Sequence, residues 1–356
     1  MKARLQFIVI ITAILLSGAC KKSSPSSVQP TPAPPETPPF LYIGGTSDSK
    51  GIYWKFSLSD TSASVIADTV ENSTNISSIV FSDSTRYMVG GSAGYWKNKS
   101  FVPVPGALQL DLLAVSGTNV YTEGEDISFN FAQWTNNTEL ANLTSAMDGF
   151  FTRADLSYGW TGMAVSGFNV LVSGTLVVEG IPQGPDSAIY AGFGVLFTNG
   201  AAQLMPYTNY TLFGGDLYHW TVGVAVSGTD TYVAGTLADT IAVPKGGYWK
   251  NDVWNSINNG LFHPLAIASS GSNVAITGYT LTVPWNPSLI QAAYWQNGNL
   301  TTFNGTQGEM VAVYGSDVYV LGSDNNGKIV VWKNGSLFKT LDGIISGSVS
   351  CIAVGI

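Results

Sequence analysis

The sequence predicts an all-β protein, a seven-bladed β-propeller made of four-stranded antiparallel blades. Three observations predict this class: a glycine-ended segment recurs along the chain, an aromatic residue follows each copy, and the two ends of the repeat region are complementary half-units. Repeats of about 45 residues that hold four short strands each are typical of propeller blades.

The glycine-ended segment has the form Val-Ser-Gly-Thr-Asn-Val-Tyr-x-x-Gly. We interpret each copy as a strand a, a tight turn and a strand b, because residues rich in Val, Ile and Tyr flank a Gly/Asn turn. The closing glycines recur about every 46 residues, at Gly44, Gly90, Gly124, Gly174, Gly235, Gly278 and Gly322.

The aromatic column marks strand c of each unit. A polar pair follows most of its members, as in Tyr95-Trp96-Lys97-Asn98. Asn-Gly and related pairs permit the positive φ angles of a tight hairpin, so a strand d should follow. No helical period is visible. The column consists of Trp54, Trp96, Trp134, Phe197, Trp249, Trp295 and Trp332.

The two ends of the repeat region predict how the ring closes. Ser350 to Val354 has the pattern of a strand a with nothing after it, and Phe40 to Gly44 has that of a strand b with nothing before it. Pairing them completes the seventh blade and leaves no free sheet edge. The alternative architecture, an open β-solenoid, would leave both half-units unpaired.

Residues 40–356, the predicted propeller, resemble bacterial outer-membrane and periplasmic propeller lipoproteins that carry Tyr-Trp-Lys-Asn-Gly repeats. The copies that carry the resemblance are Tyr95-Trp96-Lys97-Asn98, Tyr248-Trp249-Lys250-Asn251 and Val331-Trp332-Lys333-Asn334-Gly335. The resemblance implies the propeller fold and a location in the cell envelope. It brings no catalytic residues with it.

Residues 1–19 are predicted to be a signal peptide. Lys2 and Arg4 precede an apolar stretch too short to span a bilayer, and Ser17-Gly18-Ala19 places small residues before Cys20. The segment resembles the lipobox of bacterial lipoproteins, with Leu16 one place further upstream than usual. This resemblance implies cleavage before Cys20, acylation of its thiol and the lipid bilayer as a partner. No aspartate follows Cys20, which favours the outer membrane.

Residues 20–39 are predicted to tether the propeller to that anchor, because they are rich in Ser, Thr and Pro and cannot bury apolar surface. The whole chain has 15 basic and 23 acidic residues, so nucleic acid is not an expected partner. Cys351 is the one cysteine besides Cys20, which excludes an intrachain disulfide framework. No motif for a cofactor, a metal or a catalytic group is present.

One face of the propeller is the candidate binding face. The a–b and c–d turns share a uniformly tight face, here called the turn face, whereas the b–c and d–a connections share a face of variable loops, here called the loop face. The longest b–c stretches run from Gly174 to Phe197 and from Gly278 to Trp295. We expect both to form loops that surround the mouth of the central channel.

Residues that enter strand a from the loop face should ring this mouth. We expect aromatic platforms at Trp160, Trp220 and Trp285, with polar groups that orient a ligand. The alternative is that Trp160 and Trp220 pack between blades. The predicted ligand-binding residues are Trp160, Trp220, Trp285, His219, His263, Gln307, Glu309 and Asp111; Asn75 and Gln109 belong to the same ring.

Other candidate sites are less specific. Glu123, Glu125 and Asp126 form an acidic cluster that we expect in a solvated b–c loop, with calcium binding or paired carboxylates as the alternatives. Three tripeptides resemble a bacterial O-glycosylation pattern of Asp, a hydroxyl residue and an apolar residue. Their acceptor residues are Thr69, Ser187 and Thr240.

Two functions compete on this evidence. The first is a membrane-anchored binding or scaffold protein whose ligand is a glycan or another envelope protein. The second is a glycan-processing hydrolase or lyase that uses carboxylates and histidine at the same mouth. With only two histidines, His219 and His263, and few clustered charges, the sequence favours the first.

Overall fold

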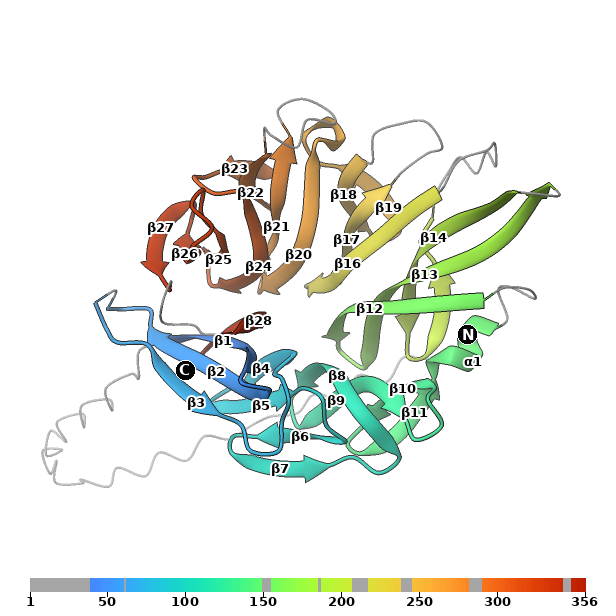
Figure 1. Cartoon of the computed structure of the whole chain (residues 1–356), viewed down its shortest axis with the longest axis horizontal. Coiled ribbons are helices and arrows are strands. Elements are labelled where there is room, and N and C mark those ends of the chain that lie inside the picture. Colours follow the sequence, from blue (N-terminus) through green and yellow to red (C-terminus); the bar gives the residue numbers. More distant parts are fainter. Residues whose placement is uncertain are drawn as a thin grey trace, which may run out of the picture. The chain divides into compact units, whose positions relative to one another are not determined.

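The computed structural model describes residues 39–60, 62–148, 155–184, 187–206, 217–237, 245–281, 290–341 and 347–356. Within these ranges, only the backbone is described for residues 148, 155–158, 178–184, 187–191 and 217–219. Residues Pro38–Ile356 form one compact unit. In this unit, seven antiparallel blades of four strands each stand in a ring (Figure 1), which confirms the predicted β-propeller.

Each blade runs from an inner strand a to an outer strand d, and blade 1 is the one that holds both chain ends. Blade 1 consists of β28 (Ser348–Gly355), β1 (Phe40–Ser47), β2 (Lys50–Ser57) and β3 (Ile66–Thr69), and blade 2 of β4 (Ser78–Ser82), β5 (Thr85–Val89), β6 (Gly94–Lys97) and β7 (Ser100–Pro103). Blade 3 consists of β8 (Ala107–Ser116), β9 (Asn119–Asp126), β10 (Phe131–Thr135) and β11 (Thr138–Asn142). Blade 4 consists of β12 (Asp155–Ser166), β13 (Asn169–Gly184), β14 (Ser187–Thr198) and β15 (Ala201–Leu204). Blade 5 consists of β16 (Leu217–Ser227), β17 (Asp230–Leu237), β18 (Lys245–Lys250) and β19 (Val253–Ser256). Blade 6 consists of β20 (Phe262–Ser270), β21 (Asn273–Leu281), β22 (Ile290–Gln296) and β23 (Asn299–Thr302). Blade 7 consists of β24 (Gln307–Tyr314), β25 (Asp317–Ser323), β26 (Ile329–Lys333) and β27 (Ser336–Thr340).

The ring closes as the sequence predicts. Strand β28 pairs antiparallel with β1, with Phe40 opposite Gly355 and Leu41 opposite Val354. Around the axis, each inner strand contacts the next one, from β28 through β4, β8, β12, β16, β20 and β24 back to β28. Both edges of the terminal strand β1 are therefore hydrogen-bonded, which removes the unpaired edge that an open sheet would expose.

The aromatic column holds the blades together. Its seven members, Trp54, Trp96, Trp134, Phe197, Trp249, Trp295 and Trp332, are all buried. The buried apolar residues fall into seven clusters, each shared by two neighbouring blades. The core is thus a series of inter-blade layers, because each sheet covers its two faces with its neighbours.

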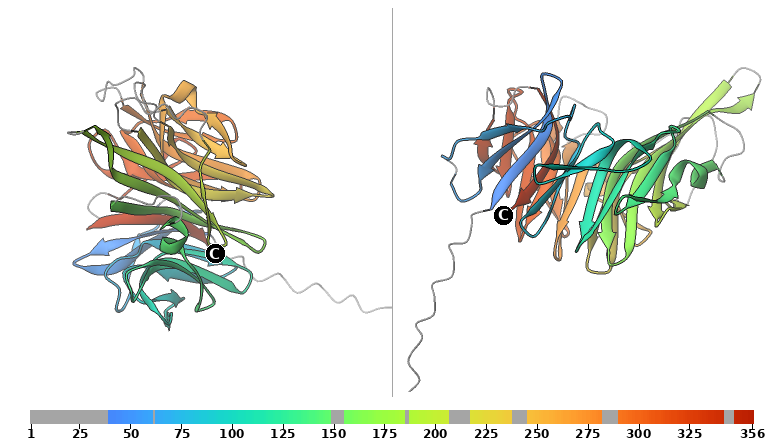
Figure 2. Two further views of the ribbon diagram at one scale, coloured as in Figure 1. Left: turned by 90° about the vertical axis from the view of Figure 1, so that its right-hand side faces the viewer. Right: turned by 90° about the horizontal axis from the view of Figure 1, so that it is seen from below.

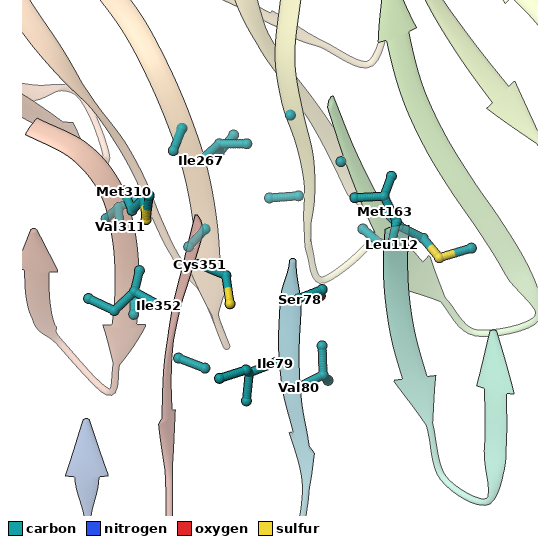
Figure 3. Close-up of a pocket in the computed structure, with 18 of the residues that line it drawn as sticks. Ser78, Ile79, Val80, Leu112, Met163, Ile267, Met310, Val311, Cys351 and Ile352 are labelled. Carbon is teal, nitrogen blue, oxygen red and sulfur yellow. The ribbon is translucent and has the colours of Figure 1, made fainter. Parts of the chain in front are cut away.

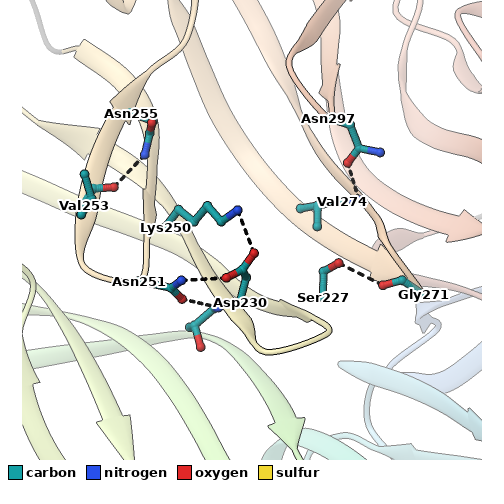
Figure 4. Close-up of polar contacts among 10 residues, drawn as sticks. Ser227, Asp230, Lys250, Asn251, Val253, Asn255, Gly271, Val274 and Asn297 are labelled. Carbon is teal, nitrogen blue, oxygen red and sulfur yellow. Dashed lines mark hydrogen bonds and ion pairs between the residues drawn. The ribbon is translucent and has the colours of Figure 1, made fainter.

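The asparagine of the repeated motif clamps strand b to the turn between strands c and d. In blade 5, Asn251 Oδ1 accepts from the Thr231 amide at 2.9 Å and its Nδ2 donates to Asp230 at 2.8 Å, while Lys250 pairs with Asp230 at 2.7 Å (Figure 4). The clamp requires a left-handed backbone, which Asn tolerates well: φ is 48° at Asn251. Equivalent acceptors in five other blades are Asn98, Asn136, Asn199, Asn297 and Asn334.

The closing glycines face a recurring β-bulge in strand a. In six blades the pairing of strand a with strand b shifts by one residue near this glycine, as between Pro264 and Ala266 opposite Gly278. A Cβ on Gly278 would lie 1.9 Å from the carbonyl oxygen of His263. In blade 1 the same role falls to Gly45, whose Cβ would lie 2.0 Å from the Ser348 oxygen. The prediction of Gly44 there was therefore wrong by one residue.

Two local expectations are corrected. The stretch from Gly174 to Phe197 is not a loop: β13 and β14 stay paired as far as Gly184 and Ser187 and form a long hairpin that extends beyond the ring (Figure 2). A parallel bridge from β14 to β16 joins blades 4 and 5 in one sheet. A short helix, α1 (Leu143–Asp148), also links blades 3 and 4, although the sequence shows no helical period. Its Leu143 and Met147 are buried against blade 4.

Candidate functional site: the channel mouth on the loop face

The seven inner strands enclose a central cavity of about 430 Å³. Its lining is apolar or small, and Ile79, Leu112, Ile267 and Ile352 are among the residues that line it (Figure 3). None of the described residues that line it carries a charge. The cavity therefore offers no acid, base or ion pair, and any polar recognition has to come from the mouth.

The bulges place a ring of side chains just outside this cavity. In four blades the residue two places before the bulge has the carbonyl oxygen that faces the closing glycine; these residues are Gln109, Trp220, His263 and Gln307. In blade 2 the Asn75 carbonyl faces Gly90, although β4 shows no register shift. Asp111 and Glu309 are bulge residues themselves and directly precede the lining residues Leu112 and Met310. The structure thus places these predicted residues at one level of the propeller.

The predicted aromatic platforms have different surroundings. Trp220 in β16 is 45% exposed, although it lies only two residues before Val222, which lines the cavity. The indole of Trp160 instead makes edge contacts with Phe131 and Phe197, both with ring centroids 5.2 Å away. Trp160 therefore lies in the layer between blades 3 and 4. Trp285 is outside the described residues.

The polar members of the ring form pairs along each strand. Gln307 Nε2 donates to Glu309 at 3.1 Å, and Gln109 Nε2 donates to Asp111 at 3.4 Å. The Ser323 hydroxyl donates to Glu309 at 3.4 Å. These amide–carboxylate pairs hold their oxygens in fixed positions at the mouth, in blades 7 and 3.

His263 stacks on Tyr279 of the neighbouring strand, with ring centroids 4.9 Å apart and planes 8° from parallel. Its Nε2 has no hydrogen-bond partner among the described residues. Burial lowers the pKa of His263, so the ring is neutral at pH 7 and available as a donor or acceptor. Of His219, only the backbone in β16 is described.

Blade 3 contains a buried acid that the sequence analysis misplaced. Glu123 is not in a solvated loop but inside β9, with a fully buried side chain. It lies directly opposite Gln133 on β10, which is also fully buried, and neither side chain has a hydrogen-bond partner among the described residues. The other blades carry an uncharged residue at the Glu123 register and an aromatic or aliphatic residue at the Gln133 register, so the polar pair is visible in the sequence.

Burial raises the pKa of Glu123 well above its ordinary value, and the nearby carboxylates of Asp111 and Glu125 raise it further. Burial also raises the pKa of Asp111, with Glu125 as a second cause. Asp126, by contrast, accepts hydrogen bonds from Ser128 and Asn130 and closes a tight loop. Among the described residues, no three Asp, Glu, His or Cys side chains are arranged to hold a metal ion.

The remaining candidates lie elsewhere. Thr69 is exposed on the outer strand β3, and Ser187 begins β14 with only its backbone described. Thr240 and Cys20 are outside the described residues. Over the part of the chain that the structure covers, no helix is long and apolar enough to cross a membrane.

No protein-family model matches the chain, and no curated protein matches it in sequence. Among solved structures, the β-propeller domain of the Trilobed protease from Pyrococcus furiosus is similar over 86% of this chain and 96% of that chain, at 9% identity and a TM-score of 0.51. The acylaminoacyl peptidase of Pyrococcus horikoshii is similar over 86% of this chain and 51% of that chain, at 12% identity and a TM-score of 0.48. The Pyrococcus furiosus domain is described as having an open velcro topology, whereas β28 and β1 close the ring here. At these identities the likeness shows the fold alone, that of a β-propeller.

Proposed function

We propose that this chain is a membrane-anchored binding protein that holds its ligand on the loop face, at the mouth of the central channel. The observation that carries the proposal is Trp220. A half-exposed indole on a rigid inner strand offers a large contact surface at little conformational cost, whereas the seven members of the aromatic column are buried. The face of such a ring suits the C–H side of a sugar, so the ligand class that we propose is a glycan.

His263, Gln307 and Glu309 supply the few polar groups that fix the orientation of a ligand on a mostly apolar site. Asp111 supplies a second carboxylate on the blade 3 side, and His219 and Trp285 belong to the same proposed mouth. Trp160 contributes indirectly, by packing between blades 3 and 4.

The experiment titrates residues 38–356 with neutral hexasaccharides of glucose, xylose and N-acetylglucosamine. Binding is measured by tryptophan fluorescence and by calorimetry. Trp220→Ala should weaken binding at least about tenfold, which corresponds to about 1.4 kcal/mol. Phe168→Ala is the matched control, because Phe168 is 92% exposed in the a–b turn of blade 4, on the turn face. Equal affinity in wild type and Trp220→Ala would contradict the proposal.

Stability separates a platform from a core residue. Removing an exposed platform should cost little, whereas loss of a packed Trp costs about 3–5 kcal/mol. If Trp220→Ala lost that much in urea unfolding, Trp220 would be part of the core and not a binding surface.

A glycan-processing enzyme is the second candidate function. The raised pKa of Asp111, caused mainly by burial, favours it, since a carboxyl group with a raised pKa is a general-acid candidate. Release of reducing ends from the same hexasaccharides, abolished in Asp111→Asn, would support the enzyme; binding without turnover would support the binding protein.

We also propose that acylated Cys20 anchors the chain in the outer membrane, with residues 20–39 as the tether. The support is the small-residue segment before Cys20 and the Pro-rich composition after it. Wild type should label with radioactive palmitate in a bacterial host and Cys20→Ser should not; a labelled Cys20→Ser protein would refute the anchor.

A further inference from the structure

A second pocket lies between blades 1 and 2, away from the central channel. Its volume is about 140 Å³. Tyr53, Met88 and Trp96 are buried and form its floor, and the charged residues that line it are Asp68, Glu71, Arg86 and Lys99. Neither the central cavity nor the pocket lined by Trp249 and Asp252 has a basic residue among the described residues of its lining.

Arg86 departs from the repeat. It is the strand b residue whose amide is held by the asparagine clamp, here by Asn98 Oδ1 at 3.0 Å. The residues clamped in the same way in the other blades are Val120, Val170, Thr231, Val274 and Val318. A long cation therefore replaces a small uncharged residue at a position where only 9% of the side chain is exposed.

The charge of Arg86 lies near Asp68 and lowers the pKa of that carboxyl, but no ion pair joins the two side chains. No described carboxylate lies within ion-pair distance of its guanidinium. The group lies over the rings of Tyr53, at 4.1 Å, and Tyr42, at 5.5 Å, and Nη2 makes one long contact of 3.5 Å with the Asn98 carbonyl. Its Nε has no hydrogen-bond partner among the described residues. A guanidinium has five N–H donors, and burying it without a counter-charge is costly.

The nearest acid, Asp68, is already engaged. It accepts from the Tyr53 hydroxyl at 2.7 Å and pairs with Lys99 at 3.1 Å. Burial and the hydrogen bond to Asp68 raise the pKa of Tyr53 to about 12, so that this donor stays protonated. The Tyr53 hydrogen bond and Lys99 lower the pKa of Asp68. Tyr53 and Lys99 therefore hold Asp68, and among the described residues no ion pair joins Arg86 to Asp68 or Glu71.

We propose that this pocket binds the carboxylate of a small hydroxylated acid, such as a sugar acid, with Arg86 as its counter-charge. A guanidinium matches a planar carboxylate with two parallel N–H donors. The pocket is smaller than the roughly 300 Å³ of a typical small-molecule site, so it takes the acid end of the ligand. Asp68 and Glu71 at the rim repel a doubly charged phosphate but accept hydrogen bonds from ligand hydroxyls. The site is independent of the proposed channel-mouth site.

The test uses D-glucuronate as probe and D-glucose, which lacks the carboxylate, as matched control. Glucuronate should raise the Tm of the propeller and bind in calorimetry at low ionic strength, and glucose should do neither. Arg86→Val introduces the residue that four other blades carry at this register, and it should abolish the response. Trp220→Ala should leave the response intact, which distinguishes this site from the channel mouth.

Two results would overturn the proposal. One is an equal Tm shift with glucuronate and glucose in the wild type. The other is a ligand-free Arg86→Val protein that unfolds at a clearly lower Tm than the wild type, because Arg86 would then be a structural cation stacked on tyrosines. Lys99→Ala tests the same logic at an exposed site: it frees Asp68 to neutralise Arg86, so the Kd for glucuronate should rise at least about tenfold. An unchanged Kd in Lys99→Ala would contradict the charge argument.

Discussion

The closing glycines should be intolerant of even one methyl group, and Gly278→Ala is the clearest case. The added Cβ would lie 1.9 Å from the His263 carbonyl oxygen and 2.9 Å from its carbon, and both are backbone atoms of the bulged strand β20. Backbone cannot rotate away as a flexible side chain can, so the two strands must separate or the bulge must change. Overpacking of this kind costs about 1–3 kcal/mol.

Gly159→Ala is the matched control for that substitution. Gly159 also lies in an inner strand, β12, but a Cβ there would meet no described atom within 4 Å. Because alanine also reduces the entropy of the unfolded chain, this variant should be neutral or more stable by about 0.4–1 kcal/mol. Urea unfolding of both variants measures the difference. A Gly278→Ala protein as stable as Gly159→Ala would refute the role assigned to the bulge.

Three further predictions concern blade 3, the clamp and the closure. Glu123→Gln should flatten the pH dependence of the free energy of unfolding. Because the pKa of Glu123 is raised in the folded state, its stabilising contribution is fully present below about pH 4.5 and is lost as pH rises through the folded pKa. The stability of the variant relative to the wild type should therefore increase at higher pH, and superimposable stability profiles would contradict this. Asn334→Ala removes the hydrogen bonds to the Val318 amide and to Asp317, both 2.8 Å long. The free energy of unfolding, measured in urea, should fall by about 1–3 kcal/mol, and a loss below about 0.5 kcal/mol would exclude the clamp as a stabilising element. Deleting residues 348–356 removes β28 and should abolish a single cooperative transition in calorimetry, whereas an unchanged Tm would count against the closed ring.

The repeat determined the fold because its two columns correspond to two physical requirements. The glycine column marks where the carbonyl of a bulged strand a crosses strand b, and the aromatic column fills the layer between blades. Both requirements recur around the ring at a regular spacing, so they can be read from the sequence alone. The half-units at the ends then determined the closure, because the sole partner of a missing strand a is the strand at the other end of the chain.

Side-chain environments at the mouth could not be read in this way. Trp160 and Trp220 lie in strand a of adjacent blades, close to the bulge, yet one packs between Phe131 and Phe197 and the other is half-exposed. Their register differs by one residue relative to the bulge: Trp160 pairs with its closing glycine, Gly174, whereas Trp220 precedes the residue that does so. Since successive strand residues point to opposite faces, a shift of one residue exchanges the two environments.

The sequence by itself determined the number of blades, their strand order, the closure and the residues that the turns require. Only the tertiary structure decided which ionisable side chains are buried without an ion-pair partner among the described residues. Glu123 and Arg86 differ from the residues at their registers in most other blades, and the sequence shows that difference. Whether such a residue lies in solvent or in a dry layer depends on the next blade, which folds against it from a distant part of the chain.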